Sequence, residues 1–151
     1  MRPIIACFAA ALSACAPQYV ERVVTDEQDL PVRRAIYQTE VDSVDKAFIK
    51  LCDAPGDEVR RFDGDIVQCR SSPTPDFAAF LLLQFDAALE PPTLVVRKKV
   101  RKQDEAFEVE MSYFAEITQK SGEPQRIYLR LPEIDAILDG FLRITGGVTP
   151  T

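Results

Sequence analysis

Residues 93–118, Thr93-Leu-Val-Val-Arg-Lys-Lys-Val-Arg-Lys-Gln-Asp-Glu-Ala-Phe-Glu-Val-Glu-Met-Ser-Tyr-Phe-Ala-Glu-Ile-Thr118, decide the fold. Apolar and charged side chains alternate on both sides of Gln103-Asp104, as in two antiparallel strands joined by a tight loop. With Gln103-Asp104 as a two-residue loop, apolar side chains face each other on one side of the sheet and opposite charges on the other. The apolar pairs are Leu94–Tyr113, Val96–Met111 and Val100–Phe107, and the charged pairs are Lys99–Glu108 and Arg97–Glu110. The segment predicts a long hairpin with one apolar and one charged face.

The flanking sequence adds further strands and three helices. Residues 126–131 alternate as a third strand after a turn at Ser121-Gly122, which sets Ile127 beside Ile117 and Leu129 beside Ala115. A shorter hairpin, 59–62 and 66–69, surrounds the turn signal Asp63-Gly64. Helical spacing predicts helices that begin near Thr39, at Thr74-Pro75 and at Pro132, and that end near residues 51, 90 and 145. The order α-β-β-α-β-β-β-α predicts a two-layer α+β sandwich, with an antiparallel sheet and helices packed on one face.

The N-terminal sequence has the layout of a secretory signal peptide. Arg2 precedes an apolar run from Ile4 to Leu12, which is shorter than the roughly 20 residues that span a bilayer. Leu12-Ser13-Ala14-Cys15 then resembles the lipobox of bacterial lipoprotein precursors. This resemblance, which covers about a tenth of the chain, implies cleavage after Ala14 and acylation of Cys15. Ala16, which is not Asp, implies by the same resemblance transfer to the outer membrane, facing the periplasm.

These features divide the chain into three parts: a signal peptide (1–14), a lipidated N-terminus with a flexible tether (15–38), and a single α+β domain (39–147). Pro17 and Pro31 interrupt regular structure in the tether, although Tyr19–Val24 could form a short edge strand. The alternative for the N-terminus is a plain signal peptide and a soluble secreted protein. The formal net charge of −6 argues against a nucleic-acid partner, and it leaves membrane attachment to the acyl chains.

Cys52 and Cys69 remain after Cys7 leaves with the signal peptide and Cys15 carries lipid. The compartment permits disulfides, so we predict a Cys52–Cys69 bond that stabilises the fold by about 3 kcal/mol. Free or redox-active thiols are the alternative. The chain contains no His, so a zinc site would lack ligands, and we predict neither a metal nor a cofactor.

The basic run 97–102 has two interpretations. Half of its cations face Glu108 and Glu110 in the predicted hairpin, which favours a neutralised ladder on a solvated face. The alternative is a surface for phosphate or lipopolysaccharide. Its candidate anion-binding residues are Arg97, Lys99, Arg101, Arg126 and Arg130.

An enzymatic role has little support, and we predict that the protein has no catalytic residue. Without His, the chain lacks the commonest general base. Ser71-Ser72 has no partner base, and Asp135 and Asp139 fit the solvated face of a helix.

The second helix carries apolar side chains beyond those needed to cover the sheet. Phe80 and Leu83 lie nearly opposite its main apolar stripe, so either another helix covers them or they dock a partner protein in the envelope. We therefore expect a non-catalytic envelope lipoprotein that acts as an interaction module or accessory subunit. The alternative is a binding protein or carrier for a hydrophobic molecule held between the second helix and the sheet.

Overall fold

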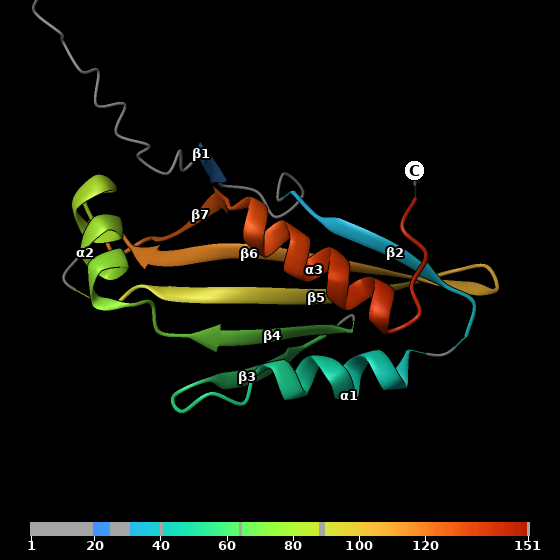
Figure 1. The fold of residues 1–151 in the computed structure, drawn as a ribbon. Coiled ribbons are helices and arrows are strands. Elements are labelled where there is room, and N and C mark those ends of the chain that lie inside the picture. Colours follow the sequence, from blue (N-terminus) through green and yellow to red (C-terminus); the bar gives the residue numbers. More distant parts are fainter. Residues whose placement is uncertain (1–19, 25–30, 40, 64, 88–89, 151) are drawn as a thin grey trace, which may run out of the picture.

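The computed structural model describes residues 20–24, 31–39, 41–63, 65–87 and 90–150, without the side chains of 20–24, 129 and 130. It confirms the α+β class: one antiparallel sheet carries helices on one face (Figure 1). The elements in chain order are β1 (Val20–Val24), β2 (Arg33–Tyr37), α1 (Asp42–Leu51), β3 (Glu58–Phe62), β4 (Ile66–Ser71), α2 (Pro75–Gln84), β5 (Thr93–Gln103), β6 (Ala106–Thr118), β7 (Pro124–Arg130) and α3 (Pro132–Ile144).

The sheet is built around the long β5–β6 hairpin. Its strand order is β1-β7-β6-β5-β4-β3, and every neighbouring pair is antiparallel. The second edge of β6 is shared by two strands. β7 pairs with Ala115–Thr118 and β2 pairs with Phe107–Met111. Strand β2 is therefore paired with residues far away in the chain, whereas β7 pairs with the part of β6 that precedes it closely in sequence.

The main core lies between one face of the sheet and the helices α1 and α3, which both cover that face (Figure 1). Phe48 of α1 and Phe141 of α3 meet edge to face with ring centroids 6.4 Å apart. Both lie on Met111 and its neighbours in the sheet, and Phe48 and Met111 are fully buried. Each helix contributes one apolar stripe to this core, as the apolar spacing predicts. The buried residues are Val44 and Phe48 in α1, and Leu138, Phe141 and Leu142 in α3.

The observed register differs from the predicted one by two residues. Gln103 pairs with Ala106, so the loop is Asp104-Glu105 and Val96 faces Tyr113. Asp104 adopts a φ of 53°, which Asp tolerates better than most residues. In the same way, Ile127 pairs with Ala115, whereas the sequence pattern predicts Ile117 as its neighbour. A shift of two residues keeps each side chain on its predicted face.

The tether prediction is wrong for residues 33–37 and incomplete for 20–24, because both segments are strands of the sheet. Ala35 and Tyr37 of β2 are buried in the main core. The Tyr37 hydroxyl donates to the carbonyl of Leu142 at 2.9 Å. A Cβ at Gly147 would lie 2.6 Å from the Cβ of Ala35, so only glycine lets the C-terminal segment cross β2 this closely.

Two helices differ from their predicted bounds. Helix α1 begins at Asp42, with Val41 rather than Thr39 as its N-cap. Helix α2 ends at Gln84 rather than near Glu90, and Ala87 instead forms a β-bridge with Gln119. In the described residues, no helix combines the length and apolar character needed to cross a membrane.

Candidate functional site

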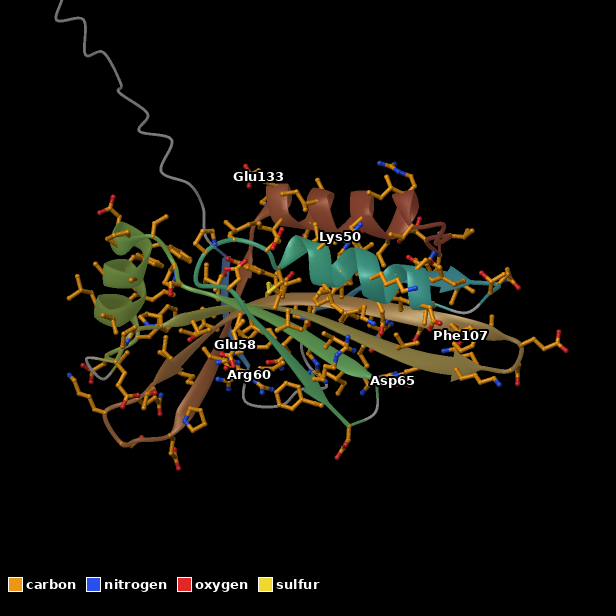
Figure 2. The ribbon with its side chains drawn as sticks, turned by 90° about the horizontal axis from the view of Figure 1, so that it is seen from below. Lys50, Glu58, Arg60, Asp65, Phe107 and Glu133 are labelled. Atoms are coloured by element: carbon orange, nitrogen blue, oxygen red, sulfur yellow. A yellow bond between two sulfur atoms is a disulfide. The ribbon has the colours of Figure 1, made fainter. Side chains whose placement is uncertain are left out.

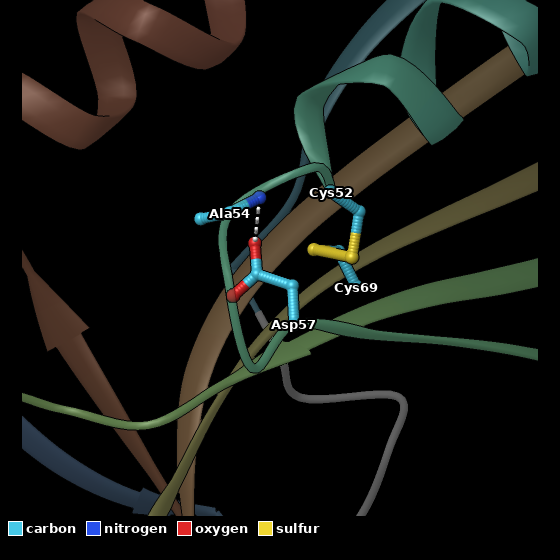
Figure 3. Close-up of a disulfide and its surroundings, with 4 residues drawn as sticks. All are labelled: Cys52, Ala54, Asp57 and Cys69. Atoms are coloured by element: carbon cyan, nitrogen blue, oxygen red, sulfur yellow. Dashed lines mark hydrogen bonds between the residues drawn. A yellow bond between two sulfur atoms is a disulfide. The ribbon is translucent and has the colours of Figure 1, made fainter.

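The predicted lipidation site, Cys15, lies outside the described residues, as does the whole of 1–19. The predicted disulfide is present. Cys52, just after α1, bonds to Cys69 of β4, with Cα atoms 5.5 Å apart (Figure 3). The Asp57 carboxylate accepts a hydrogen bond from the Ala54 N–H at 3.3 Å in the same loop. Both sulfurs are consumed by the bond, so the grouping of Cys52, Asp57 and Cys69 offers a metal ion no thiolate.

Helix α2 stands at one end of the sheet, apart from the α1–α3 layer (Figure 1). Thr74 in extended conformation and Pro75 in the first turn begin the helix as the sequence predicts. Its fully buried anchor is Leu81, which packs on Ala115 and Ile127 of the sheet. Leu83 is 86% exposed. The α2 helix therefore offers a large apolar side chain to solvent at the end of the molecule.

Phe80 and Leu83, which the sequence pattern pairs, have different environments in the structure. The Phe80 ring is half-buried and packs against the cluster around Leu81. It also stacks on Phe77, with ring centroids 6.0 Å apart and planes 9° from parallel. Phe80 therefore helps to hold α2 on the sheet, and Leu83 is the outward-facing member of the predicted pair.

The sheet face opposite α1 and α3 carries a groove of about 300 Å³, here called the arginine groove. Cross-strand register assembles it from five strands. Its polar lining residues are Arg60, Gln68, Arg70, Arg97, Glu116 and Arg126, and Phe62 and Ile66 complete it. Figure 2 shows Arg60 and Glu58 on this underside, away from Lys50 on α1 and Glu133 on α3.

Carboxylates fix several of these guanidinium groups. Glu116, which is 20% exposed, forms salt bridges with Arg70 at 2.7 Å and with Arg126 at 3.1 Å. Arg126 also lies over the Phe114 ring, 5.2 Å from its centroid. Glu58 binds Arg60 through two contacts of 2.8 and 3.0 Å, and this pairing lowers the pKa of the Glu58 carboxyl. Salt bridges thus hold the arginines in defined positions.

The five candidate anion-binding residues do not form one site. Arg97 and Arg126 line the groove, whereas Lys99 and Arg101 lie toward the hairpin loop and the Arg130 side chain is outside the described residues. Arg101 contacts the buried Glu110 at 3.2 Å, in agreement with a neutralised ladder. Arg97 is only 6% exposed, so the expectation of a fully solvated face is wrong there.

Sequence reasoning missed Arg60 and Arg70, since only the register of β3, β4 and β5 brings them beside Arg97. It also missed Lys98, which lies on the helix-covered face and forms an ion pair with Asp45 of α1. Asp139, weighed as a possible acid catalyst, is bound by Arg33, with Nε 2.7 Å from Oδ1. That contact gives Asp139 a structural role.

No protein-family model matches the chain, and neither the curated proteins nor the solved structures give a significant match to it.

Proposed function

We propose that this protein is a lipid-anchored bacterial envelope lipoprotein that acts, without catalysis, as an interaction module or accessory subunit of an envelope assembly. In this proposal Cys15 carries the lipid and the domain faces the periplasm from the outer membrane. The support for the anchor is Leu12-Ser13-Ala14-Cys15 behind a charged start and an apolar run.

The exposure of Leu83 carries the interaction role. An 86% exposed leucine, on a helix that also bears Phe77, Phe80 and Leu82, keeps apolar surface in water unless a partner covers it. Burial of a leucine side chain contributes about 1.5–3 kcal/mol, so one such residue at the centre of an interface is a sizeable anchor.

Strand β1 limits how far the domain can stand from the lipid. Only residues 16–19 separate Cys15 from Val20, the first residue of β1. Five residue steps reach at most about 18 Å. The domain is therefore confined close to the anchor, which suits an accessory subunit that meets its partner near the membrane.

The packing under α2 favours this role over the hydrophobic carrier. Leu81, Ala115, Ile117 and Ile127 are each at most 3% exposed and are in one cluster with Phe77, Phe80 and Phe85. Side chains thus occupy the space in which a carried molecule would lie. Lipid that co-purifies with the Cys15→Ser protein would reverse this preference.

Metabolic labelling tests the anchor. Cells that express the wild-type chain should incorporate labelled palmitate into it, and the Cys15→Ser chain should remain unlabelled. Label retained by Cys15→Ser would contradict lipidation at this residue.

Leu83→Glu tests the interaction role. The side chain is solvated, so the free energy of unfolding should change by less than about 0.5 kcal/mol, as for other surface substitutions. Partner binding should nevertheless be lost, whereas Lys50→Glu on α1 should retain it. An unfolded Leu83→Glu protein would show that the side chain is covered within the domain, and would contradict the proposal.

A further inference from the structure

The outward side of α3 carries two large apolar side chains that are exposed to water. Ile137 is 59% exposed and Ile144 is 80% exposed, although the opposite side of the same helix is buried in the main core. The two isoleucines are two helical turns apart, so they lie one above the other along the helix. Burial of either side chain in an interface would be favourable. This surface is separate from Leu83, which lies on α2.

Gly140 lies between the two isoleucines, in the interior of α3. Glycine is among the least favourable residues in a helix interior. A Cβ at this position would lie in open space, with nothing within 4 Å. Within the residues that the structure describes, packing therefore gives no reason for the missing side chain. A helix from another molecule, however, can approach α3 more closely where a side chain is missing.

Charged residues near the two ends of α3 give its outward side a pattern that is complementary to itself. Four residues follow at intervals of four, three and four along one side of the helix: Glu133, Ile137, Gly140 and Ile144. Glu133 is in the first turn and points away from the sheet (Figure 2), and Arg143 is in the last turn. Both side chains are exposed, and neither has an ion pair within the described part of the chain.

We propose that α3 is a dimerisation surface, which packs antiparallel against α3 of a second copy of this chain about a two-fold axis. With the axis between residues 138 and 139, Ile137 of each copy lies over Gly140 of the other. The reversed direction also brings Glu133 of each copy beside the last turn of the other, which carries Arg143. Because a two-fold interface uses the same surface of both copies, each contact is made twice. Parallel packing would instead set the two Glu133 side chains against each other.

The size of this surface indicates a reversible dimer. A single pair of helices gives a small interface, and small interfaces are typical of weak or transient association. The proposal rests neither on the lipid anchor nor on Leu83. If Cys15 is lipidated, confinement of the copies in one membrane would raise their effective concentration and favour the dimer further.

Sedimentation equilibrium over a range of protein concentrations tests the dimer. The full chain carries Cys15→Ser, so that no acyl chain contributes and a failure of the anchor proposal leaves the result intact. We expect an equilibrium between monomer and dimer without larger species, because a two-fold interface closes on itself. A monomer at every concentration up to about 1 mM, at which even a weak complex forms, would overturn the proposal.

Gly140→Gln tests the close approach of the two helices. The added side chain has open space in the monomer, and glutamine favours a helix more than glycine does. In dilute solution the variant should therefore unfold at a higher urea concentration than wild type. It should nevertheless weaken the dimer at least about tenfold, because the side chain occupies the place of Ile137 of the other copy. Ala79→Gln enlarges an exposed position of α2 equally and should leave the dimer unchanged.

A charge exchange tests the antiparallel direction. Glu133→Arg and Arg143→Glu should each weaken the dimer about tenfold, because each change brings like charges together twice. The double variant should restore the affinity of the wild type, since opposite charges then face each other again. Lys102→Glu, at an exposed position near the end of β5, should change the affinity less than about twofold.

Two outcomes of the variant series would contradict the proposal even if the wild type associates. One is association that is equally strong in Gly140→Gln and in Ala79→Gln, since it would place the contact elsewhere in the chain. The other is a double charge variant that associates as weakly as the two single variants, since it would exclude the antiparallel contact between Glu133 and Arg143.

Discussion

Tyr113 illustrates at the scale of one residue how burial couples stability to pH. Its ring is 9% exposed in the main core, and burial raises the pKa of the phenol above its ordinary value of 10.0. Burial likewise raises the pKa of Tyr37, although its hydrogen bond with Thr145 opposes the effect. A raised pKa in the folded state means that the neutral phenol stabilises the fold below about pH 10. This contribution is lost as the pH rises through the folded-state pKa.

We therefore expect the free energy of unfolding to fall above about pH 10, and to fall less steeply in Tyr113→Phe, which cannot ionise. Urea unfolding at several pH values between about 9 and 11 measures both slopes. Tyr19→Phe, outside the described residues, is a control for the loss of one tyrosine. Identical slopes for Tyr113→Phe and wild type would contradict the account.

The Lys98–Asp45 ion pair is asymmetric. The Lys98 side chain is 1% exposed, whereas Asp45 is 34% exposed and also has Arg61 at 3.8 Å. Removal of Asp45 would leave a buried ammonium group without this carboxylate. Removal of Lys98 leaves a carboxylate that water and Arg61 still reach. The two deletions should therefore have unequal costs.

We expect Asp45→Asn to lower the free energy of unfolding by about 3–5 kcal/mol, and Lys98→Met to change it by less than about 1 kcal/mol. Asp42→Asn removes a carboxylate from the same first turn of α1 and controls for the helix dipole. Chemical denaturation ranks the three variants. A larger loss in Lys98→Met than in Asp45→Asn would show that the lysine is not an unfavourable buried charge.

At the scale of elements, the disulfide ties the end of α1 to β4, 17 residues later in the chain. Closing such a loop stabilises the fold by about 3 kcal/mol on the chain-entropy model. We expect Cys52→Ala with Cys69→Ala, or reduction of the wild type, to lower stability by about that amount. Guanidinium unfolding with and without reductant measures it. Two free thiols per mature, lipidated chain in denaturant without reductant would contradict the bond.

Local pattern was enough to predict the short β3–β4 hairpin, the long β5–β6 hairpin and α3. Each has its own alternation or helical stripe and its own turn or cap residue, as at Asp63-Gly64 and Pro132. The two-residue error in the register has a physical cause, because an alternating pattern is unchanged when the register shifts by two residues. The observed loop is Asp104-Glu105, in which Asp104 adopts a φ of 53°, and the alternation does not indicate this choice over the predicted loop Gln103-Asp104.

The elements that were missed depend on distant partners. Strand β2 is only five residues long, and its partner residues in β6 are 70 to 78 positions away along the chain. Helix α2 ends at Gln84, Asp86 adopts a φ of 49°, and Ala87 pairs with Gln119, a partner more than 30 residues away that local pattern does not indicate. The arginine groove has the same origin. Arg60, Arg70 and Arg126 come from separate strands, so their convergence follows from register and not from any motif.

At the scale of the whole molecule, three surfaces have distinct characters. Helices α1 and α3 cover the main core, the opposite face carries the arginine groove, and α2 projects Leu83 from one end of the sheet (Figures 1 and 2). The short link between Cys15 and β1 keeps all three near the proposed lipid anchor.

Photo-crosslinking in living bacterial cells tests the interaction role most directly, with a probe at Leu83 and a control probe at Lys50 on α1. Both positions are exposed, so neither probe should disturb the fold. The account predicts a discrete protein adduct at Leu83 and none at Lys50, and mass spectrometry would identify the partner. A folded domain without an adduct at Leu83, or with the same adducts at both positions, would contradict an interaction module built on α2.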